Sequence, residues 1–414
     1  MKNLIIFLFL FGSVGNTFSQ KELNDYLKTA AENNASLKMA FSEYRAALEM
    51  LPQAKALPDP NLMFQYFTTP VYQEMGIQRF SLSASQAFPW FGQLKAKEQV
   101  AAEMAKAKYQ AFIDERNKLF KEVKEIYFKL YVQNKSVEIT TENLKLLQSM
   151  RELVRIGFES GKGSFVNVLR TDMEIAEMGN KLEYFKDSKW PLQAEFEKSL
   201  NTKISAALIF PDTLWKDTLA SVKSILIDSI AIHNPSLKKM DYDIASWEKQ
   251  IEASKKMGYP SFSLGITYTN MSKRPEPNGR IHENGKDMYM FPEIGLMLPI
   301  YRKKYNAMLN EAKFRSESAS YEKLNMTSEL NSELEMAYRD YLDAQRRMIL
   351  YDRLYKLAKN TRELLLSTFS TSGTEFEEVL RMQEQELMYA LELEDARAML
   401  NSSVAEINYL TGKQ

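Results

Sequence analysis

Two long runs without proline or glycine constrain the fold of this chain more than any other feature. No proline lies between Pro89 and Pro191, and none follows Pro299. Glycine is absent from Gln93 to Ile156 and again from Leu296 to Ser372. Both runs are rich in Ala, Leu, Glu, Lys, Met and Gln, which are strong helix formers. We therefore predict two helices far longer than the globular mean of about 11–12 residues.

Each run ends at a glycine cluster, at residues 160–164 and 371–374. Glycine provides a left-handed helix cap, and Ser164 or Thr374 can N-cap the helix that follows. Each run is therefore predicted to form a helical hairpin whose tip is the cluster. Gly163 follows Pro89, and Gly373 follows Pro299, by 74 positions. The helix that leads to each tip would therefore be about 100 Å long. Two helices of equal length fit the wall of a cylinder whose helices end at the same level. The apolar spacing along them is typical of coiled-coil packing, and an ordinary coiled-coil rod explains it equally well.

The two halves of the chain resemble each other beyond these hairpins. Asn34–Lys38 matches Asn234–Lys238 at an offset of 200, and Phe165–Arg170 matches Phe376–Arg381 at 211. A tandem duplication is the simplest cause of offsets that persist across helices, turns and strands. We expect a first structural repeat at 20–201, a linker at 202–228 and a second repeat at 229–414.

The first 19 residues have the layout of a secretory signal peptide. Lys2 supplies positive charge, Leu4–Phe11 is an apolar run, and small residues precede a plausible cleavage site before Gln20. No other stretch approaches the roughly 20 apolar residues that a transmembrane helix requires. The mature chain is therefore expected to be exported, and any membrane crossing would use β-strands.

Composition excludes several classes of function. Lys plus Arg equals Asp plus Glu at 54 each, whereas a protein that neutralises phosphates is normally basic. Nucleic acid is therefore not an expected partner. The chain has no cysteine and two histidines, so a dedicated metal centre, a cofactor and catalytic residues are not expected. The 22 methionines suit soft metal ions, but their spacing among Leu and Ala favours core packing.

Each half also contains two segments in which apolar and small polar residues alternate. They lie at about 61–69, 78–88, 261–270 and 287–298, each near the length of a tilted membrane-spanning strand. Lipid-facing and water-facing positions alternate in this way in transmembrane barrels, but half-buried strands of a soluble sandwich alternate too. The residues that we expect to face the membrane are Phe64, Tyr66, Phe80, Leu82, Phe262, Leu264, Ile266, Tyr268, Ile294 and Leu296.

Four strands cannot cover their own edges, and membrane barrels begin at about eight strands. Several copies would therefore share one barrel, and three copies would give 12 strands. The long polar segment between the last two strands, from Asn270 to Lys286, is typical of an extracellular barrel loop.

Taken together, these features resemble those of the TolC-type outer-membrane efflux proteins, in particular of their heavy-metal and cation branch. The resemblance covers the mature chain in order: helix, two strands and helical hairpin, then the same again. It is carried by Leu57–Leu62 before the first strand, Gly295–Ile300 after the fourth, and Arg155–Leu169 around the first tip.

The resemblance implies a mixed α/β membrane protein that is mainly α. Three copies would form a 12-stranded transmembrane β-barrel, with four strands per subunit, continuous with a long α-helical barrel in the periplasm. It implies the outer membrane of a Gram-negative bacterium, a homotrimer in contact with lipid, a periplasmic adaptor (membrane fusion) protein and an inner-membrane pump. Trp90 and Tyr301 would anchor the transition from barrel to tunnel.

The resemblance also assigns two groups of site residues. The adaptor would dock on the hairpin tips, which are Gly161, Lys162, Gly163, Ser164, Ser372, Gly373 and Thr374. Acidic residues just past the tips commonly narrow the periplasmic entrance in this family. That place is held by Glu378 in the second half and by the neutral Asn167 in the first, which weakens the case for a double acidic ring.

Two other classes remain open from the sequence. A secreted or periplasmic coiled-coil scaffold with small soluble β-domains would explain the helices. An enzyme is disfavoured, because the chain lacks nucleophile, phosphate-binding, dinucleotide-binding and zinc motifs. Carboxylate-only catalysis is formally compatible with the composition.

Overall fold

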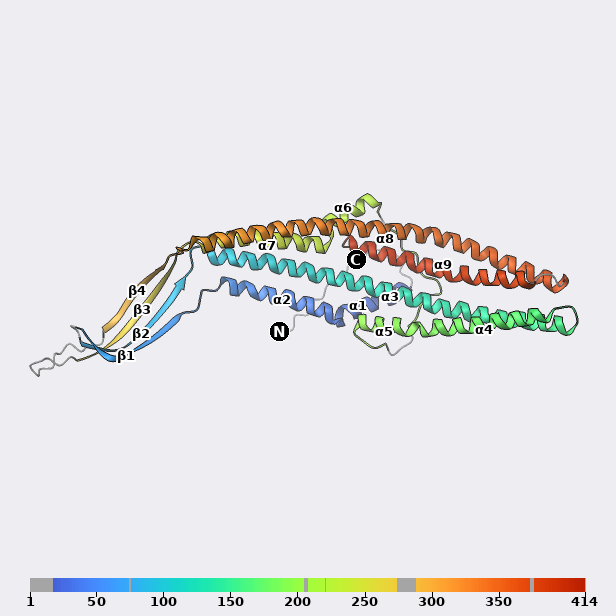
Figure 1. Ribbon diagram of the computed structural model, residues 1–414, viewed down its shortest axis with the longest axis horizontal. Helices are drawn as coiled ribbons and strands as arrows, with labels where there is room; N and C mark the ends of the chain where they lie inside the picture. The colour runs from blue at the N-terminus through green and yellow to red at the C-terminus, as the bar shows by residue number, and fades with distance from the viewer. Residues whose placement is uncertain are drawn as a thin grey trace, which may run out of the picture. The chain divides into compact units, whose positions relative to one another are not determined.

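The structure is a computed structural model that describes residues 18–73, 76–204, 208–219, 221–273, 288–372 and 376–413. Figure 1 shows the order of the elements along the chain. Of the predicted signal peptide at 1–19, residues 1–17 lie outside the described residues. The first described helix begins at Phe18.

The same order of elements occurs in both halves. The first half contains α1 (Phe18–Asn33), α2 (Ala35–Lys55), β1 (Asn61–Gln73), β2 (Gly76–Phe88), α3 (Gln93–Glu159), α4 (Phe165–Asp187) and α5 (Lys189–Leu200). The second half contains α6 (Lys223–His233), α7 (Pro235–Met257), β3 (Ser261–Ser272), β4 (Met288–Met297), α8 (Arg302–Ser372) and α9 (Phe376–Leu410). Helices α3 and α8 have 67 and 71 residues, which confirms the two long helices predicted from the missing proline and glycine.

Two details differ from the sequence prediction. The return arm of the first hairpin is broken at Ser188 into α4 and α5, whereas α9 is continuous. Pro191 follows the break, and because proline lacks an N–H it cannot donate to the carbonyl of Asp187. The second difference concerns the linker at 202–228, whose last part already belongs to α6 from Lys223.

The chain divides into two compact units. One comprises Met1–Met39, Ile113–Asn234 and Ser328–Gln414, and the other comprises Ala40–Phe112 and Pro235–Thr327. In the first unit, an apolar core joins α3 and α4 to α9 through Leu147, Val168 and Val379. In the second unit, Ala96 and Val100 of α3 pack with Ala253 of α7.

The second unit also contains the β-sheet. Its four strands lie in the order β1-β2-β3-β4, as Figure 1 shows. All neighbouring strands are antiparallel. The alternation predicted at about 287–298 is not continuous in β4. This strand has one extra residue between Phe291, opposite Thr267, and Met288, opposite Thr269. A bulge of this kind shifts the residues beyond it to the other register.

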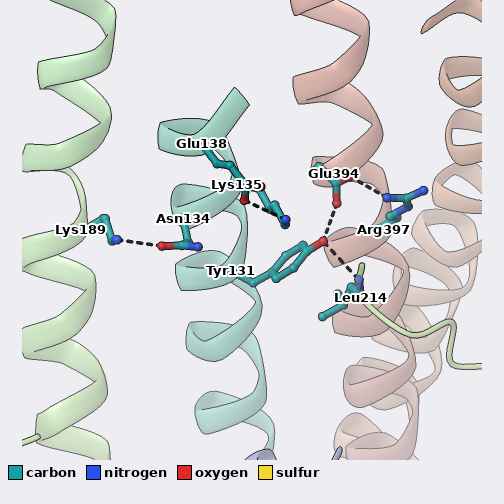
Figure 2. Close-up of polar contacts among 8 residues, drawn as sticks. All are labelled: Tyr131, Asn134, Lys135, Glu138, Lys189, Leu214, Glu394 and Arg397. Atoms are coloured by element: carbon teal, nitrogen blue, oxygen red, sulfur yellow. Dashed lines mark hydrogen bonds and ion pairs between the residues drawn. The ribbon is translucent and has the colours of Figure 1, made fainter. Parts of the chain in front are cut away.

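In the first unit, an extended segment at 208–219 is bound to the helices by side chains that reach its backbone. Tyr131 accepts a hydrogen bond from Leu214 N at 3.2 Å and donates one to Glu394 Oε2 at 2.6 Å (Figure 2). Asn401 donates to Trp215 O at 2.8 Å and accepts from Asp217 N at 3.0 Å. Burial raises the pKa of the Tyr131 hydroxyl, as does the adjacent Glu394 carboxylate. These side chains therefore satisfy three backbone groups of a segment that belongs to no helix or sheet.

Candidate functional site

The first candidate surface is the apolar face of the sheet. Directly opposed residues of neighbouring strands point to the same face, and the register pairs Phe64 with Leu82 and Leu82 with Tyr268. It also pairs Leu264 with Ile294. All ten residues predicted to face the membrane share this face: Phe64, Tyr66, Phe80, Leu82, Phe262, Leu264, Ile266, Tyr268, Ile294 and Leu296.

This apolar face is open rather than packed. Ile294 is 82% exposed, Phe64 64% and Leu296 64%. The rings of Phe64 and Phe80 contact each other across β1 and β2 at 5.9 Å between centroids, and those of Phe80 and Tyr268 at 6.2 Å. A soluble sandwich would bury these side chains under a second layer. A wide exposed patch of aromatic and aliphatic side chains is instead typical of a surface that meets lipid or protein.

The opposite face of the sheet carries small and polar side chains that form hydrogen bonds across the strands. Ser81 Oγ donates to Gln65 Oε1 at 3.1 Å. Thr267 Oγ1 donates to Glu293 Oε1 at 2.5 Å and lies 2.6 Å from Ser83 Oγ. The sheet therefore separates an apolar face from a polar one, as the strand alternation predicts.

Aromatic rings gather at the end of the sheet where the strands meet the helices. Trp90 stacks on Tyr259 at 5.8 Å between ring centroids and contacts Phe91 edge-on at 5.9 Å. Phe88 stacks on Phe262 at 5.6 Å. Tyr301, the predicted counterpart of this region in the second half, is 78% exposed. Indole and phenol rings of this kind suit the boundary between lipid and water.

The first hairpin tip is built by two helix caps. Gly161 has a positive φ of 73°, its N–H donates to Phe158 O, and the N–H of Lys162 donates to Gly157 O. This is the Schellman pattern, and the left-handed residue suits glycine. Ser164 then N-caps α4 by accepting from Val166 N at 3.2 Å. The cap geometry predicted at this tip is confirmed.

A Cβ atom at Gly163 would lie 3.3 Å from backbone atoms of Gly157 and Phe158, so the turn is closely packed there. Around it, the four predicted tip residues are exposed. Apolar side chains next to the tip are exposed as well: Ile156, Phe158, Phe165, Val166 and Leu169.

The second tip is described only in part. Of its predicted residues, Ser372 is the last residue of α8, whereas Gly373 and Thr374 lie outside the described residues. The flanking aromatic contact repeats that of the first tip. Phe158 and Phe165 have ring centroids 5.1 Å apart, and Phe369 and Phe376 are also 5.1 Å apart. Each pair bridges the two helices of its hairpin, and the pairs are related by the offset of 211.

The two residues predicted at the periplasmic entrance differ in surroundings. Glu378 forms an ion pair with Arg381, one turn further along α9. Asn167 lies in the first turn of α4, and its carbonyl accepts a hydrogen bond from Thr171 Oγ1 at 2.8 Å. The structure adds one contact that the sequence analysis missed, an ion pair from Arg170 of α4 to Glu377 of α9. Arg170 occupies the position equivalent to Arg381, but the residue three positions before it is the neutral Asn167 rather than Glu378, so it has no acidic partner there.

A cluster of carboxylates lies on the hairpin helices beyond the tips. Burial raises the pKa of Glu174, and the charges of Glu177 and Glu384 raise it further. Among the described residues, no group of three or more His, Cys, Asp or Glu side chains is arranged to hold a metal ion. None of the helices in the described ranges is both long and apolar enough to cross a membrane.

A four-stranded antiparallel sheet with one open apolar face, combined with two long helical hairpins, is the fold of the solved outer-membrane channel structures that this chain resembles. Residues 26–187 match the family described as outer membrane efflux protein. The resemblance predicted from the sequence is therefore confirmed.

Individual proteins agree with this class. The toxin and drug export protein A of Aggregatibacter actinomycetemcomitans is 20% identical over 292 residues, which are 68% of this chain and 61% of that protein. The chain thus matches about three-fifths of the relative's length. The solved structure of CusC superposes with a TM-score of 0.79 at 16% identity, covering 98% of this chain and 96% of that one. The outer membrane protein VceC of Vibrio cholerae gives 0.76 at 15% identity, covering 95% and 96%.

Proposed function

We propose that this chain is one subunit of a trimeric efflux channel in the outer membrane of a Gram-negative bacterium. Three copies would share a 12-stranded barrel, continuous with a tunnel of long helices in the periplasm. The observation that carries the proposal is the two-faced sheet, whose exposed apolar face would meet lipid while its hydrogen-bonded polar face lines a water-filled lumen.

The two edge strands of the sheet support a barrel that is shared between copies of the chain. Within the described residues, β1 pairs only with β2, and β4 pairs only with β3. Each edge strand therefore presents unpaired N–H and C=O groups, which cannot remain unsatisfied in hydrocarbon. Pairing β4 of one copy with β1 of the next would satisfy both edges and close the barrel.

The hairpin tips would serve as the docking site for a periplasmic adaptor protein that connects the tunnel to an inner-membrane pump. The exposed side chains around Gly161–Ser164 support this role, because an apolar rim next to a rigid turn suits helix-to-helix contact. Ser372, Gly373 and Thr374 would form the equivalent site on the second hairpin. The channel itself would be a passive exit duct, and the pump would supply the energy.

The geometry of the sheet and of the tips also argues against the other two classes, a soluble coiled-coil scaffold and an enzyme. A soluble scaffold would have to cover the apolar face of the sheet, which is exposed. We also propose that the chain has no catalytic activity, since the described residues of the polar face and of the tips present no paired general acid and base with a nucleophile.

The test is the oligomeric mass of the protein purified from membranes in detergent, measured by light scattering corrected for bound detergent. We expect a trimer in the membrane fraction. Phe64→Arg places a charge on the apolar face and should abolish membrane-inserted trimers. Gln65→Arg changes the adjacent residue on the polar face and should leave them intact. A soluble wild-type monomer or dimer, or equal loss in both variants, would contradict the proposal.

A further inference from the structure

The strands of the sheet carry very little charge. In the residues of β1, β2, β3 and β4 the charged side chains are Arg79 and Glu293. Arg79 lies where the register of β2 shifts between Gln78 and Phe80. Glu293 lies within the regular part of the sheet, directly opposite Gly265. It is therefore the carboxylate that the regular pleat of this sheet places on its polar face.

The hydrogen bonds around Glu293 fix its position. Thr267 uses its hydroxyl proton to donate to Glu293 Oε1 at 2.5 Å. Each hydroxyl has one proton, so Ser83, 2.6 Å from Thr267 Oγ1, is the donor in that contact. The result is a directed chain from Ser83 through Thr267 to the carboxylate, which spans β2, β3 and β4. A chain of this kind polarises each bond toward the charge and orients the carboxylate.

The polar-face positions next to Glu293 carry small side chains or none, because the strands pack closely there. Gly265 faces it across β3 and β4, and a Cβ atom there would lie 3.5 Å from Glu293 Cβ and 3.2 Å from Ala84 O. The neighbouring polar-face positions on β2 and β3 are Ser85 and Ser263. Glu293 is exposed, and no Lys or Arg of the described ranges forms an ion pair with it. By contrast, the charge of Glu378 at the predicted entrance is offset by Arg381.

We infer that Glu293 is a selectivity-determining residue of the barrel lumen, an inference that rests on the proposed function. In a trimer that shares one barrel, Glu293 of each copy lies at the same height on the lumenal face, so the copies form a ring of carboxylates. Rings of Asp or Glu attract cations and repel anions in pores. The barrel would therefore favour cationic and ammonium-bearing solutes as they leave the cell.

The experiment measures ion selectivity of purified trimers in planar bilayers, from the reversal potential under a KCl gradient. Wild type should prefer K⁺ over Cl⁻, and Glu293→Gln should lower the permeability ratio roughly twofold or more. Gln65→Glu adds an acid to the same face, where Ser81 already donates to the amide oxygen. It should raise the ratio, and in the Glu293→Gln background it should restore it.

The outcomes separate the inference from the proposed function. Conducting trimers with the same reversal potential in wild type and Glu293→Gln would overturn the role of Glu293 and leave the channel standing. A wild-type protein that inserts but does not conduct would overturn the channel, and the inference with it. Trimer mass by light scattering confirms that each variant is assembled, and the gain expected from Gln65→Glu tests the ring without removing Glu293.

Discussion

Asn34 and Asn234 make equivalent hydrogen bonds in the two halves of the chain. Asn34 Nδ2 donates to Ser199 O at 2.9 Å, and Asn234 Nδ2 donates to Leu410 O at 2.9 Å. Each asparagine lies between two helices, α1 and α2 or α6 and α7, and each acceptor lies at the end of a hairpin's return arm. The donors differ by the offset of 200 and the acceptors by that of 211, which supports the proposed tandem duplication.

We expect Asn234→Ala to destabilise the protein by about 1–3 kcal/mol, because it leaves the carbonyl of Leu410 without this donor in a buried setting. Asn34→Ala should have a smaller effect, since its bond is only partly buried. Thermal unfolding of the detergent-solubilised protein provides the measurement. A larger loss in Asn34→Ala would contradict the assignment.

The ends of the return arms are also equivalent. Asn201 has a φ of 49° and Gly412 a φ of 67°, and both close a Schellman turn. A Cβ atom at Gly412 would lie 2.6 Å from His233 O. Gly412→Ala should therefore destabilise the fold by about 1–3 kcal/mol, through both the left-handed backbone and the contact. Asn201→Gly removes only its hydrogen bond to Asn33 O and should lower the unfolding temperature less. Equal unfolding temperatures for Gly412→Ala and wild type would refute the prediction.

Arg151 and Arg362 occupy equivalent positions in α3 and α8 but differ in burial. Arg362 and its partner Glu386 have side chains that are 9% and 12% exposed, whereas those of Arg151 and Asp172 are 40% and 42% exposed. Arg362→Ala would leave Glu386 buried without its partner and should destabilise the protein by about 3 kcal/mol or more. Arg151→Ala should change the unfolding temperature little, since exposed pairs contribute weakly. A double-mutant cycle with Glu386→Ala measures the coupling, and a coupling near zero would disprove this account.

The features that the sequence predicted are those with local signals. Missing proline and glycine set the long helices, Gly161 and Ser164 have the chemistry of a turn, and period-two alternation placed Phe64 and Ile294 on one face. Each of these signals depends on a few neighbouring residues, so it can be recognised in the sequence without knowledge of the fold.

The features that the sequence did not predict depend on residues far apart in the chain. Tyr131, Asn401 and the backbone of 214–217 meet only in three dimensions. The extra residue in β4 reflects its pairing with β3, and alternation alone cannot reveal it. Arg170 pairs with Glu377 of the second hairpin, because its own helix has the neutral Asn167 where the equivalent Arg381 has Glu378.

Glu174 should make stability depend on pH. Burial first, and then the charges of Glu177 and Glu384, raise its pKa in the folded state. The folded chain therefore binds this proton more tightly than the unfolded chain, so the contribution is present at low pH and is lost as pH rises through the raised pKa. Glu174→Gln should raise the unfolding temperature at neutral pH, and the difference should vanish on acidification below the ordinary glutamate range.

Glu152 provides the control of opposite sign. Its hydrogen bond from Arg155 lowers its pKa, so its contribution is present above the ordinary glutamate range and is lost as pH falls through the lowered value. Glu152→Gln should therefore lower the unfolding temperature at neutral pH by a small amount, since the pair with Arg155 is exposed. Unfolding curves of both variants across pH provide the check, and shifts of the same sign at neutral pH would refute the assignment of these pKa directions.

A substitution in the first tip should abolish adaptor docking without preventing assembly of the trimer. Gly163→Val introduces a branched side chain whose Cβ lies 3.3 Å from the backbone of Gly157 and Phe158, so the turn must move. The core around Leu147 and Val168 lies within the hairpin helices and should be retained. We expect trimers of normal mass in the membrane, together with loss of drug or metal resistance in cells that depend on this channel. Gly157→Ala, where a Cβ meets nothing within 4 Å, is the matched control and should retain resistance. Normal resistance in Gly163→Val would show that the adaptor does not dock on this turn, and loss of trimers would show that the tip serves assembly instead.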